Sequence, residues 1–490
     1  MMSLINTQYG VTNLRLAFPK EKEMQFKDLS FHYKKGEKIL MLGPSGCGKS
    51  TLMQVLCGLV PEHIEYPMKA DDIKLPEKWG YVFQDPDSQF CMSYVDEEIA
   101  FVLENLQVPR IEMPDMIKKY LNKVGLHLEE THTPINQLSG GMKQRLATAS
   151  ALALDPDTLF LDEPTAMLDP EGTEELWQMI QEVAADKTVI IVEHKIDHVI
   201  HFVDRVVLFN DEGKIIADGE AGTIFKDYQS KLDDYGIWYP GVWNQNYGNE
   251  PLMIESQDTT PLLQVEDFTV YRKKTPKVHV QELLVSSGEW ITIIGKNGAG
   301  KSTLLEGIMD LLPNSGNCRD LSNGGSSGMT FVFQNPEFQF VTDKVIDELE
   351  YGLKMKKVDH STINERVNQA LIQFSLANQI NQHPYQLSIG QKRRLSVACA
   401  LLESPKMILL DEPTFGQDAK NTFALLEYFE KLRRNGTAVI MVTHEMEIVK
   451  RFATRILEIE DGKLKKDLLT ARGQFMLNRT ESIYLDAVKA

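Results

Sequence analysis

The stretch "GPSGCGKST" at residues 43–51 recurs as "GKNGAGKST" at residues 295–303. Both fit the pattern Gly-x4-Gly-Lys-Ser, whose glycines let backbone N–H groups wrap around phosphate oxygens without a Cβ in the way. Each copy follows a short apolar run and precedes a helical pattern, so a bound phosphate would meet the positive end of a helix. The sequence therefore predicts two nucleotide-phosphate loops in one chain.

Each loop also supplies a cation and a hydroxyl suited to ATP bound with Mg²⁺. Lys49 and Lys301 are expected to reach the β- and γ-phosphates, and Ser50 and Ser302 to bind Mg²⁺. The residues predicted to bind ATP are Gly43, Pro44, Ser45, Gly46, Cys47, Gly48, Lys49, Ser50, Thr51, Gly295, Lys296, Asn297, Gly298, Ala299, Gly300, Lys301, Ser302 and Thr303.

A set of landmarks recurs along the chain at a nearly constant distance. The two lysines lie 252 residues apart, and Gln84, Ser139, Glu163 and His194 each recur 249 or 250 residues downstream. This regularity indicates two copies of one domain. We expect a first domain at residues 1–235, an aromatic-rich linker at 236–260 and a second domain at 261–490.

The linker contains "GIWYPGVW", which is more aromatic than a free connector. We expect Trp238, Tyr239 and Trp243 to pack on a domain surface; the alternative is a site for a ligand or partner.

The composition limits the possible functions. Of the 490 residues 42% are hydrophobic and 25% charged, as in globular proteins, and the net charge of −18 argues against broad nucleic-acid binding. No apolar run approaches the roughly 18 residues that span a bilayer, so we expect any membrane role to depend on a partner. Five cysteines without a CxxC pair favour reduced thiols.

Each copy reads as short apolar runs alternating with helical stretches. "KILMLG", "TLFLDEP" and "TVIIVEH" predict buried strands of a parallel sheet, and residues 95–155 predict a mostly helical subdomain. The expected fold class is α/β, with two tandem P-loop domains.

Paired acids follow an apolar run in both copies, in "LFLDEPT" (159–165) and "ILLDEPT" (408–414). Asp162 and Asp411 are placed to hold Mg²⁺ in a P-loop protein. Glu163 and Glu412 come next and are candidate general bases that polarise the attacking water.

"LSGGMKQR" (138–145) and "LSIGQKRR" (387–394) place a serine and a glycine at a helix start, 23 residues before each aspartate. Alone, this pattern fits a helix cap. In this order, with the phosphate loops, Gln84, Gln334, His194 and His444, the chain resembles the ATP-binding cassette (ABC) ATPases. The resemblance implies a core sheet, an antiparallel β subdomain and a helical subdomain in each copy.

The resemblance also implies that two cassettes pair head to tail. Each ATP then lies between the phosphate loop of one cassette and the signature serine of the other. Pairing within one chain would complete both sites. Site one would join Lys49, Ser50, Gln84, Asp162, Glu163 and His194 to the signature residues Ser388, Ile389 and Gly390. Site two would join Lys301, Ser302, Gln334, Asp411, Glu412 and His444 to Ser139, Gly140 and Gly141. The glutamates and histidines are the catalytic candidates, and the serines of the loops, the two glutamines and the two aspartates are the Mg²⁺ candidates.

Three smaller expectations follow. Phe18 and Tyr271 are candidate rings for stacking on adenine, with core packing as the alternative.

His194, His198 and His201 have the spacing of a metal site on a helix, but in the second copy only His194 has a counterpart, His444. We interpret this shared histidine as a γ-phosphate contact and the other two as helix-face residues. Ile389 replaces the glycine of the first signature, and our hypothesis is that site one closes or hydrolyses less efficiently.

A finer resemblance lies in "FQDPDSQF" (83–90) and "FQNPEFQF" (333–340), followed by "VDEEIAF" and "VIDELEYG". These resemble the ATPases of energy-coupling factor (ECF) importers, whose partners are a transmembrane coupling subunit and a separate substrate-capturing membrane subunit. That implies a peripheral protein on the cytoplasmic face of the cell membrane. The fused tandem form, with "GIWYPGV" between the cassettes, resembles importers of thiamine or its precursor hydroxymethylpyrimidine; cobalt and other vitamins are the alternative substrates. The alternatives are a tandem ABC ATPase acting on ribosomes and an ATP-gated interaction module.

Overall fold

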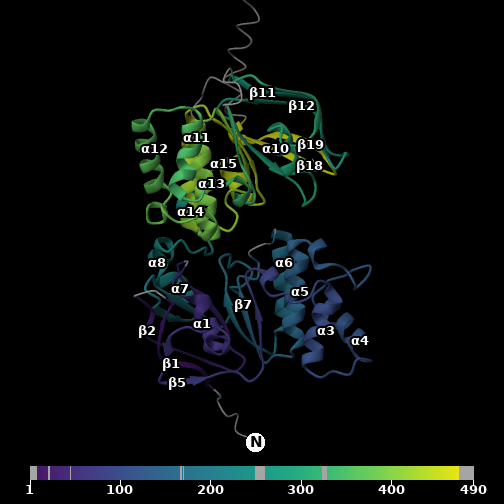
Figure 1. Cartoon of the computed structure of the whole chain (residues 1–490), viewed down its shortest axis with the longest axis vertical. Coiled ribbons are helices and arrows are strands. Elements are labelled where there is room, and N and C mark those ends of the chain that lie inside the picture. Colours follow the sequence, from purple (N-terminus) through teal and green to yellow (C-terminus); the bar gives the residue numbers. More distant parts are fainter. Residues whose placement is uncertain are drawn as a thin grey trace, which may run out of the picture. The chain divides into compact units, whose positions relative to one another are not determined.

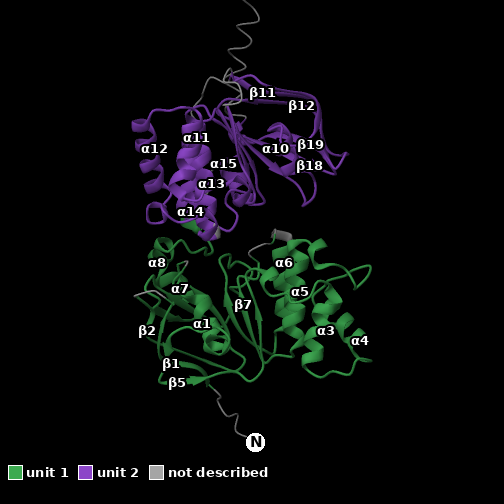
Figure 2. Cartoon of the chain, in the orientation of Figure 1, with its two compact units in different colours: residues 1–242, 418–420 green, residues 243–417, 421–490 purple. Residues whose placement is uncertain are grey.

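The computed structural model describes residues 8–19, 23–44, 46–165, 168, 170–248, 260–322 and 328–473. The chain divides into two compact units, one of residues 1–242 with 418–420 and one of residues 243–417 with 421–490 (Figure 2). Each unit is described by itself. The domain boundaries expected from the sequence remain predictions.

The first unit combines a parallel core sheet with a small antiparallel sheet (Figure 1). In the core sheet the strand order is β10-β9-β3-β8-β7-β6; every neighbouring pair is parallel except β10 with β9. Strands β7 and β8 are buried along their whole length, as their apolar runs predict. The antiparallel sheet has the order β2-β1-β4, and β5 also pairs with β1.

The elements of this unit are β1 (Gln8–Ala17), β2 (Met24–Lys34), β3 (Lys38–Leu42), α1 (Lys49–Leu56), α2 (Leu59–Glu62), β4 (Met68–Lys69), β5 (Asp72–Lys74), β6 (Trp79–Val82), η1 (Pro86–Ser88), α3 (Val95–Asn105), α4 (Met113–Lys123), η2 (Ile135–Gln137), α5 (Gly140–Ala153), β7 (Thr158–Asp162), α6 (Pro170–Val183), β8 (Thr188–Val192), β9 (Arg205–Phe209), β10 (Ile215–Gly219), α7 (Ala221–Asp227), α8 (Gln229–Asp234) and the start of α9 (Val242–Tyr247).

The second unit repeats this plan with its strands joined into one sheet. The order is β14-β11-β12-β19-β18-β13-β17-β16-β15, with parallel pairing from β18 through β15 and antiparallel pairing among β14, β11 and β12. A single parallel register pair, His279 with Lys463, connects the two parts.

Its elements are β11 (Pro261–Arg272), β12 (Thr275–Ser286), β13 (Trp290–Ile294), α10 (Lys301–Ile308), β14 (Asn314–Asp320), β15 (Met329–Val332), η4 (Pro336–Gln339), α11 (Val345–Met355), α12 (His360–Gln373), η5 (Ala377–Gln379), η6 (Pro384–Gln386), α13 (Ile389–Leu402), β16 (Met407–Asp411), α14 (Ala419–Arg434), β17 (Ala438–Val442), α15 (Met446–Phe452), β18 (Arg455–Glu460) and β19 (Lys463–Leu469).

The helical subdomains confirm the pattern seen in the sequence. In the first unit α5 packs against α3 and α4, and in the second α13 packs against α11 and α12 (Figure 1). Helix α1 ends at Leu56, because Gly58 follows in the left-handed region with φ of 86°.

The aromatic linker residues pack as expected. Trp238 and Tyr239 are 6% and 5% exposed, and the Tyr239 hydroxyl donates to Asp233 Oδ1 at 2.5 Å. Trp243 packs edge-on against Phe423 and, partly buried, against the hydrophobic core of the second unit. These contacts favour an anchored linker over a ligand or partner site.

Within the described ranges, every helix is too short or too polar to cross a bilayer.

Candidate functional site

The two phosphate loops connect the first core strand of each unit to the following helix, β3 to α1 and β13 to α10. The residue before each helix is a glycine in the left-handed region, Gly48 with φ of 102° and Gly300 with φ of 108°. A Cβ at Gly48 would lie 2.7 Å from the Phe26 ring, so any other residue would be both strained and crowded there. Ser45 lies outside the described residues.

The loop lysines are buried beneath the loops. Lys49 is 8% exposed, and its Nζ atom donates to the carbonyls of Gly43 at 2.8 Å and Pro44 at 2.9 Å. Lys301 is 7% exposed and donates in the same way to the carbonyls at Gly295 and Lys296. Each ammonium is therefore held at the centre of its loop, where phosphate charge is expected.

The Cys47 thiol is only 1% exposed and packs in the hydrophobic core of the first unit. Burial raises its pKa, and the nearby Lys49 opposes this rise. Only the backbone of Cys47 is therefore available to a phosphate, and the thiol is not.

In the first unit the predicted Mg²⁺ ligands Ser50 and Asp162 meet. Ser50 Oγ donates to Asp162 Oδ1 at 2.9 Å, and the hydroxyl of Tyr81 donates to the other oxygen at 2.9 Å. Burial raises the pKa of Asp162, although both hydroxyls lower it. Sequence reasoning missed Tyr81, because a tyrosine on a buried strand is ordinary core composition.

The second unit differs at this point. Phe331 takes the place of Tyr81, and Asp411 Oδ1 is buried without a hydrogen-bond partner among the described residues. A hydroxyl beside a buried carboxylate offers the hard oxygen ligands that Mg²⁺ prefers, so the residues of both units fit this ion. In the described chain no group of three or more His, Cys, Asp or Glu is arranged to hold a metal.

Both candidate general bases sit on strained backbone. Glu163 has φ of 48° and Glu412 has φ of 51°, in a region that few side-chain-bearing residues adopt. Their N–H groups donate to the last residues of the neighbouring strands, Val192 and Val442, which holds the turns in place. Strain of this kind concentrates at functional sites, and here it recurs at the same position in both units.

The surroundings of the two glutamates differ. Glu163 accepts from Gln84 Nε2 at 2.6 Å and pairs with His194 Nε2 at 2.9 Å. Glu412 lies 3.3 Å from His444 Nε2, and the matching Gln334 is exposed. The structure thus brings Gln84 to the general base and not to the Ser50–Asp162 pair.

The pKa values follow these contacts. Burial would raise the pKa of Glu163, but the hydrogen bond and charge of His194 outweigh it and hold the pKa below its ordinary value. Burial raises the pKa of Glu412 to about 8, with the charge of Asp411 adding to the rise. The first unit therefore holds its general base ready as a carboxylate at neutral pH.

The signature serines both cap a 14-residue helix. Ser139 Oγ accepts from the N–H of Met142 at the start of α5, and Ser388 Oγ accepts from the N–H of Gln391 at the start of α13, each at 3.3 Å. The cap and the anion-binding interpretations are compatible, because both depend on a helix N-terminus. The side chain of Ile389 lies outside what the structure describes, so the hypothesis about site one stays a prediction.

The structure explains the residues that follow Gln84 and Gln334, whose role the sequence left open. Lys143 on the signature helix pairs with Asp87 at 2.7 Å, and Gln89 Nε2 donates to the Ala147 carbonyl on the same helix at 3.0 Å. In the second unit Lys392 pairs with Glu337 at 2.5 Å, and Gln339 binds the Ser396 carbonyl at 3.1 Å. Both units therefore fasten this loop, the Q-loop (83–90 and 333–340), to the signature helix.

A buried carboxyl behind the first general base was missed by sequence reasoning. Glu193 is 5% exposed, accepts from Thr165 Oγ1 at 2.8 Å and from the His194 N–H at 2.9 Å. Burial raises its pKa from 4.5 to about 7, and the charge of Glu163 adds to the rise. The second unit has Thr443 at this position, so only the first unit carries the group.

We expect Glu193→Gln to change the pH dependence of stability. The folded carboxyl holds its proton from about pH 4.5 to 7 while the unfolded one has lost it, so its contribution to the free energy of unfolding falls as pH rises through this window. Between about pH 5 and 7 the free energy of unfolding of the wild type should fall by roughly 1 kcal/mol per pH unit relative to that of the variant. Denaturant unfolding at several pH values measures this; parallel curves would contradict it.

The candidate adenine rings have protein contacts of their own. Phe18 meets Tyr66 edge-on with ring centroids 5.3 Å apart, and the Tyr271 hydroxyl lies 3.1 Å from Ser315 Oγ. Both rings remain partly exposed, so stacking stays a prediction.

One histidine expectation is wrong. His198 and His201 lie in turns after β8 and not on a helix face, because residues 194–202 form no helix, in contrast to α15 of the second unit.

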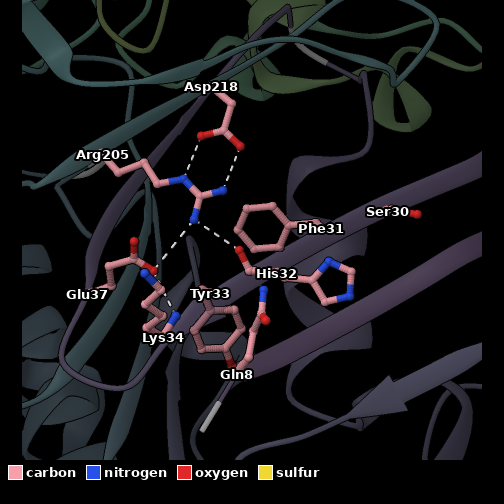
Figure 3. Close-up of a pocket in the computed structure, with 9 residues that line it drawn as sticks. All are labelled: Gln8, Ser30, Phe31, His32, Tyr33, Lys34, Glu37, Arg205 and Asp218. Carbon is pink, nitrogen blue, oxygen red and sulfur yellow. Dashed lines mark hydrogen bonds and ion pairs between the residues drawn. The ribbon is translucent and has the colours of Figure 1, made fainter. Parts of the chain in front are cut away.

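A polar hollow in the first unit is lined by a cluster of ion pairs around Arg205. Figure 3 shows Arg205 bonded to Asp218, Glu37 and the His32 carbonyl. The second unit repeats the cluster: Arg455 binds Asp467 at 2.5 Å, Glu289 at 3.4 Å and the Leu284 carbonyl at 2.8 Å. The charged groups satisfy one another in both units, which favours a structural role for the cluster.

Comparison with known proteins agrees with this geometry. The model of the family described as "ABC transporter" matches residues 26–166 and 278–415, more than half of the chain. A Bacillus subtilis protein named "Putative HMP/thiamine import ATP-binding protein YkoD" is 35% identical over 511 aligned positions, which cover 93% of this chain and 90% of the relative. A Methanosarcina mazei protein named "Putative ABC transporter ATP-binding protein" is 33% identical, covering 93% and 88%.

Among solved structures, the complex of the archaeal ribosomal stalk protein aP1 with the ribosome recycling factor aABCE1 contains a chain with a TM-score of 0.66. That match covers 96% of this chain and 92% of the other at 20% identity. At this identity the likeness supports the tandem fold alone.

Proposed function

The chain belongs to the ABC transporter family of ATP-binding proteins, and from this membership we propose that it is the ATP-hydrolysing subunit of an ECF-type importer. It is an ATPase with two ATP-binding domains, as its family members are. The presence of the loop lysine, hydroxyl, aspartate, glutamate and histidine in both units supports ATP hydrolysis, and the sequences "FQDPDSQF" and "FQNPEFQF" after each phosphate loop support the ECF type.

The residues divide the chemistry among them. Lys49 and Lys301 bind and orient the β- and γ-phosphates, and Mg²⁺, when bound beside Ser50–Asp162 and Ser302–Asp411, neutralises the charge that develops on the phosphates. Glu163 accepts a proton from the attacking water, and His194 keeps that carboxylate ionised and aimed. In the second set Glu412 takes the role of the base and His444 Nε2 lies 3.3 Å from it, but Glu412 must first lose its proton because burial raises its pKa to about 8.

We further propose that the two cassettes pair head to tail within the chain, so that Ser388 completes the site of Lys49 and Ser139 completes the site of Lys301. The support is the family resemblance, together with the matching helix caps at both serines. Closure on ATP and reopening after hydrolysis would then supply mechanical work.

The proposed partners are a transmembrane coupling subunit and a separate substrate-capturing membrane subunit, which would place the chain on the cytoplasmic face of the membrane. The name of the Bacillus subtilis relative supports hydroxymethylpyrimidine or thiamine as cargo. The net charge of −18 supports a transporter over a ribosome factor.

The second unit offers an apolar surface for such a partner beside its Q-loop. Phe338 is 75% exposed and Val341 is 65% exposed, and they lie four and seven residues after Gln334. Tyr385 is 52% exposed and its hydroxyl reaches the Glu337 carbonyl, so η6 borders the same surface. We call Phe338, Val341 and Tyr385 the docking face, and propose that an apolar helix of the coupling subunit lies on it.

Replacing Phe338 and Val341 together by aspartate should release the protein from membranes. Two charges on the docking face would have to be desolvated on contact, so we expect the membrane-bound fraction to fall about tenfold while ATP binding is unchanged. Membrane co-sedimentation from cells measures the fraction.

The matched control is Ile372→Asp, which changes a side chain that is 76% exposed on α12 of the same unit. The control should stay membrane-bound. Retention of the docking-face variant, or equal release of the control, would count against the proposed function.

A further inference from the structure

Both Q-loops are fastened to their signature helices by two shared bonds, the lysine–acid pair and the second glutamine. These bonds hold the far part of each loop, from Asp87 to Gln89 and from Glu337 to Gln339. They leave the near part, which contains Gln84 or Gln334, to be held by other groups.

In the second unit Arg393 holds the near part. This arginine projects from α13, is 2% exposed, and donates from Nη1 to the Phe333 carbonyl at 2.7 Å and from Nη2 to the Gln334 carbonyl at 2.5 Å. Two charge-assisted bonds from one planar group fix both position and orientation. Burial lowers the pKa of Arg393 to about 10, and the charges of Asp411 and Glu412 oppose the fall, so the side chain stays cationic at neutral pH.

In the first unit the same position is Gln144, 249 residues earlier. Its Nε2 atom donates to the Phe83 carbonyl alone, at 3.4 Å, and its Oε1 atom is buried without a hydrogen-bond partner in the described chain. One long neutral bond therefore stands where the second unit has two short charged ones.

We propose that Arg393 is a positioning residue that locks the Q-loop of the second unit to its signature helix, so that Gln334 and Ser388 shift together. Arg393 lies four residues beyond Ile389, the first residue of the helix that Ser388 caps, and it binds two adjacent carbonyls of the loop. The first unit holds Gln84 more loosely to Ser139.

The effect of this lock on the two ATP sites rests on the proposed function. Under head-to-tail pairing, Gln334 belongs to one site and Ser388 to the other, so Arg393 joins the two sites through a single side chain. The coupling between the two ATP sites then runs mainly through the second unit, because Gln144, the counterpart of Arg393 in the first unit, makes only one long hydrogen bond.

The exchange of the two side chains tests the lock in the full-length protein. In Arg393→Gln we expect hydrogen–deuterium exchange of the amides in residues 333–341 to speed up about tenfold, and Arg393→Lys should restore only part of the protection because it lacks the fork of donors. In the reciprocal variant Gln144→Arg, exchange in residues 83–91 should slow. Unchanged exchange of 333–341 in Arg393→Gln would overturn the proposal; should that variant fail to fold, faster or unchanged exchange in Gln144→Arg would do so.

The link between sites has its own readout, the Hill coefficient for ATP in turnover. Arg393→Gln should bring it close to 1 with a smaller change in the half-saturating ATP concentration. A wild-type coefficient of 1, or one that Arg393→Gln leaves unchanged, would overturn the inter-site role. Complete absence of turnover in wild type would instead contradict the proposed function and leave the exchange result standing.

Discussion

ATP turnover should fall about 10³-fold when Glu163 and Glu412 are both replaced by glutamine, with ATP binding retained. Glutamine keeps the size of each side chain but cannot accept the proton of the attacking water. The strained backbone at both positions, with φ of 48° and 51°, is tolerated equally by glutamine, so the loss reports on chemistry. Phosphate release and equilibrium ATP binding measure the two quantities.

The single variants should be unequal at pH 7. Glu163, ionised through His194, remains as the base in Glu412→Gln, so this variant should be the faster of the two. Glu175→Gln is a suitable control, because Glu175 is an exposed partner of Arg145. Turnover in the double variant within a few-fold of wild type would show that neither glutamate is the base.

The second large effect is expected at the signature serines. Ser139→Arg and Ser388→Arg each replace a small helix cap by a bulky cation, and in a head-to-tail pair each would block the site of the other cassette's phosphate loop. We expect the blocked site to lose about 10²-fold in turnover, comparable to the loss of a donor that stabilises transition-state charge. The two variants are matched controls for each other, since the same change is made at equivalent caps.

Loss of the cap itself costs about 1 kcal/mol of stability in either variant. Thermal unfolding should therefore show similar shifts for both, and a collapse of folding in only one of them would exclude that variant from the comparison.

Sequence patterns predicted those features that depend on residues near one another in the chain. Apolar runs gave the buried parallel strands, and the spacing of Gly48, Lys49 and Ser50 gave the phosphate loop, because a loop and the helix start after it form a local structure. The repeat added strength, since each motif could be checked against its copy.

Contacts that depend on three-dimensional packing could not be read in this way. The bond from Tyr81 to Asp162 joins neighbouring strands whose register no local pattern specifies, and Glu193 looked like a polar residue at the end of a strand. The left-handed backbone of Glu163 is set by a bond to Val192, 29 residues away. Comparison of the two copies position by position could have flagged Tyr81, Gln144 and Glu193, because the second copy has Phe331, Arg393 and Thr443 there.

The two copies differ in the contacts that hold their catalytic groups. In a symmetric repeat both units would make the same contacts. In this chain Asp162 and Glu163 of the first unit accept hydrogen bonds from Tyr81 and Gln84, whereas in the second unit Arg393 holds the Q-loop. For this reason we expect the site of Glu163 to be the faster of the two, whereas the hypothesis about Ile389 predicts a slower turnover at that same site; the two single glutamate variants decide between these effects.

The most direct test of the central claim, that each cassette completes the other's site, is ATP turnover by two double variants. In the background of Glu163→Gln, which silences the site of Lys49, adding Ser388→Arg should leave the residual turnover unchanged, because both changes fall in that one site. Adding Ser139→Arg should abolish the residual turnover, because it blocks the remaining site of Lys301. The opposite result, survival with Ser139→Arg and loss with Ser388→Arg, would show that each cassette works with its own signature and would contradict the account.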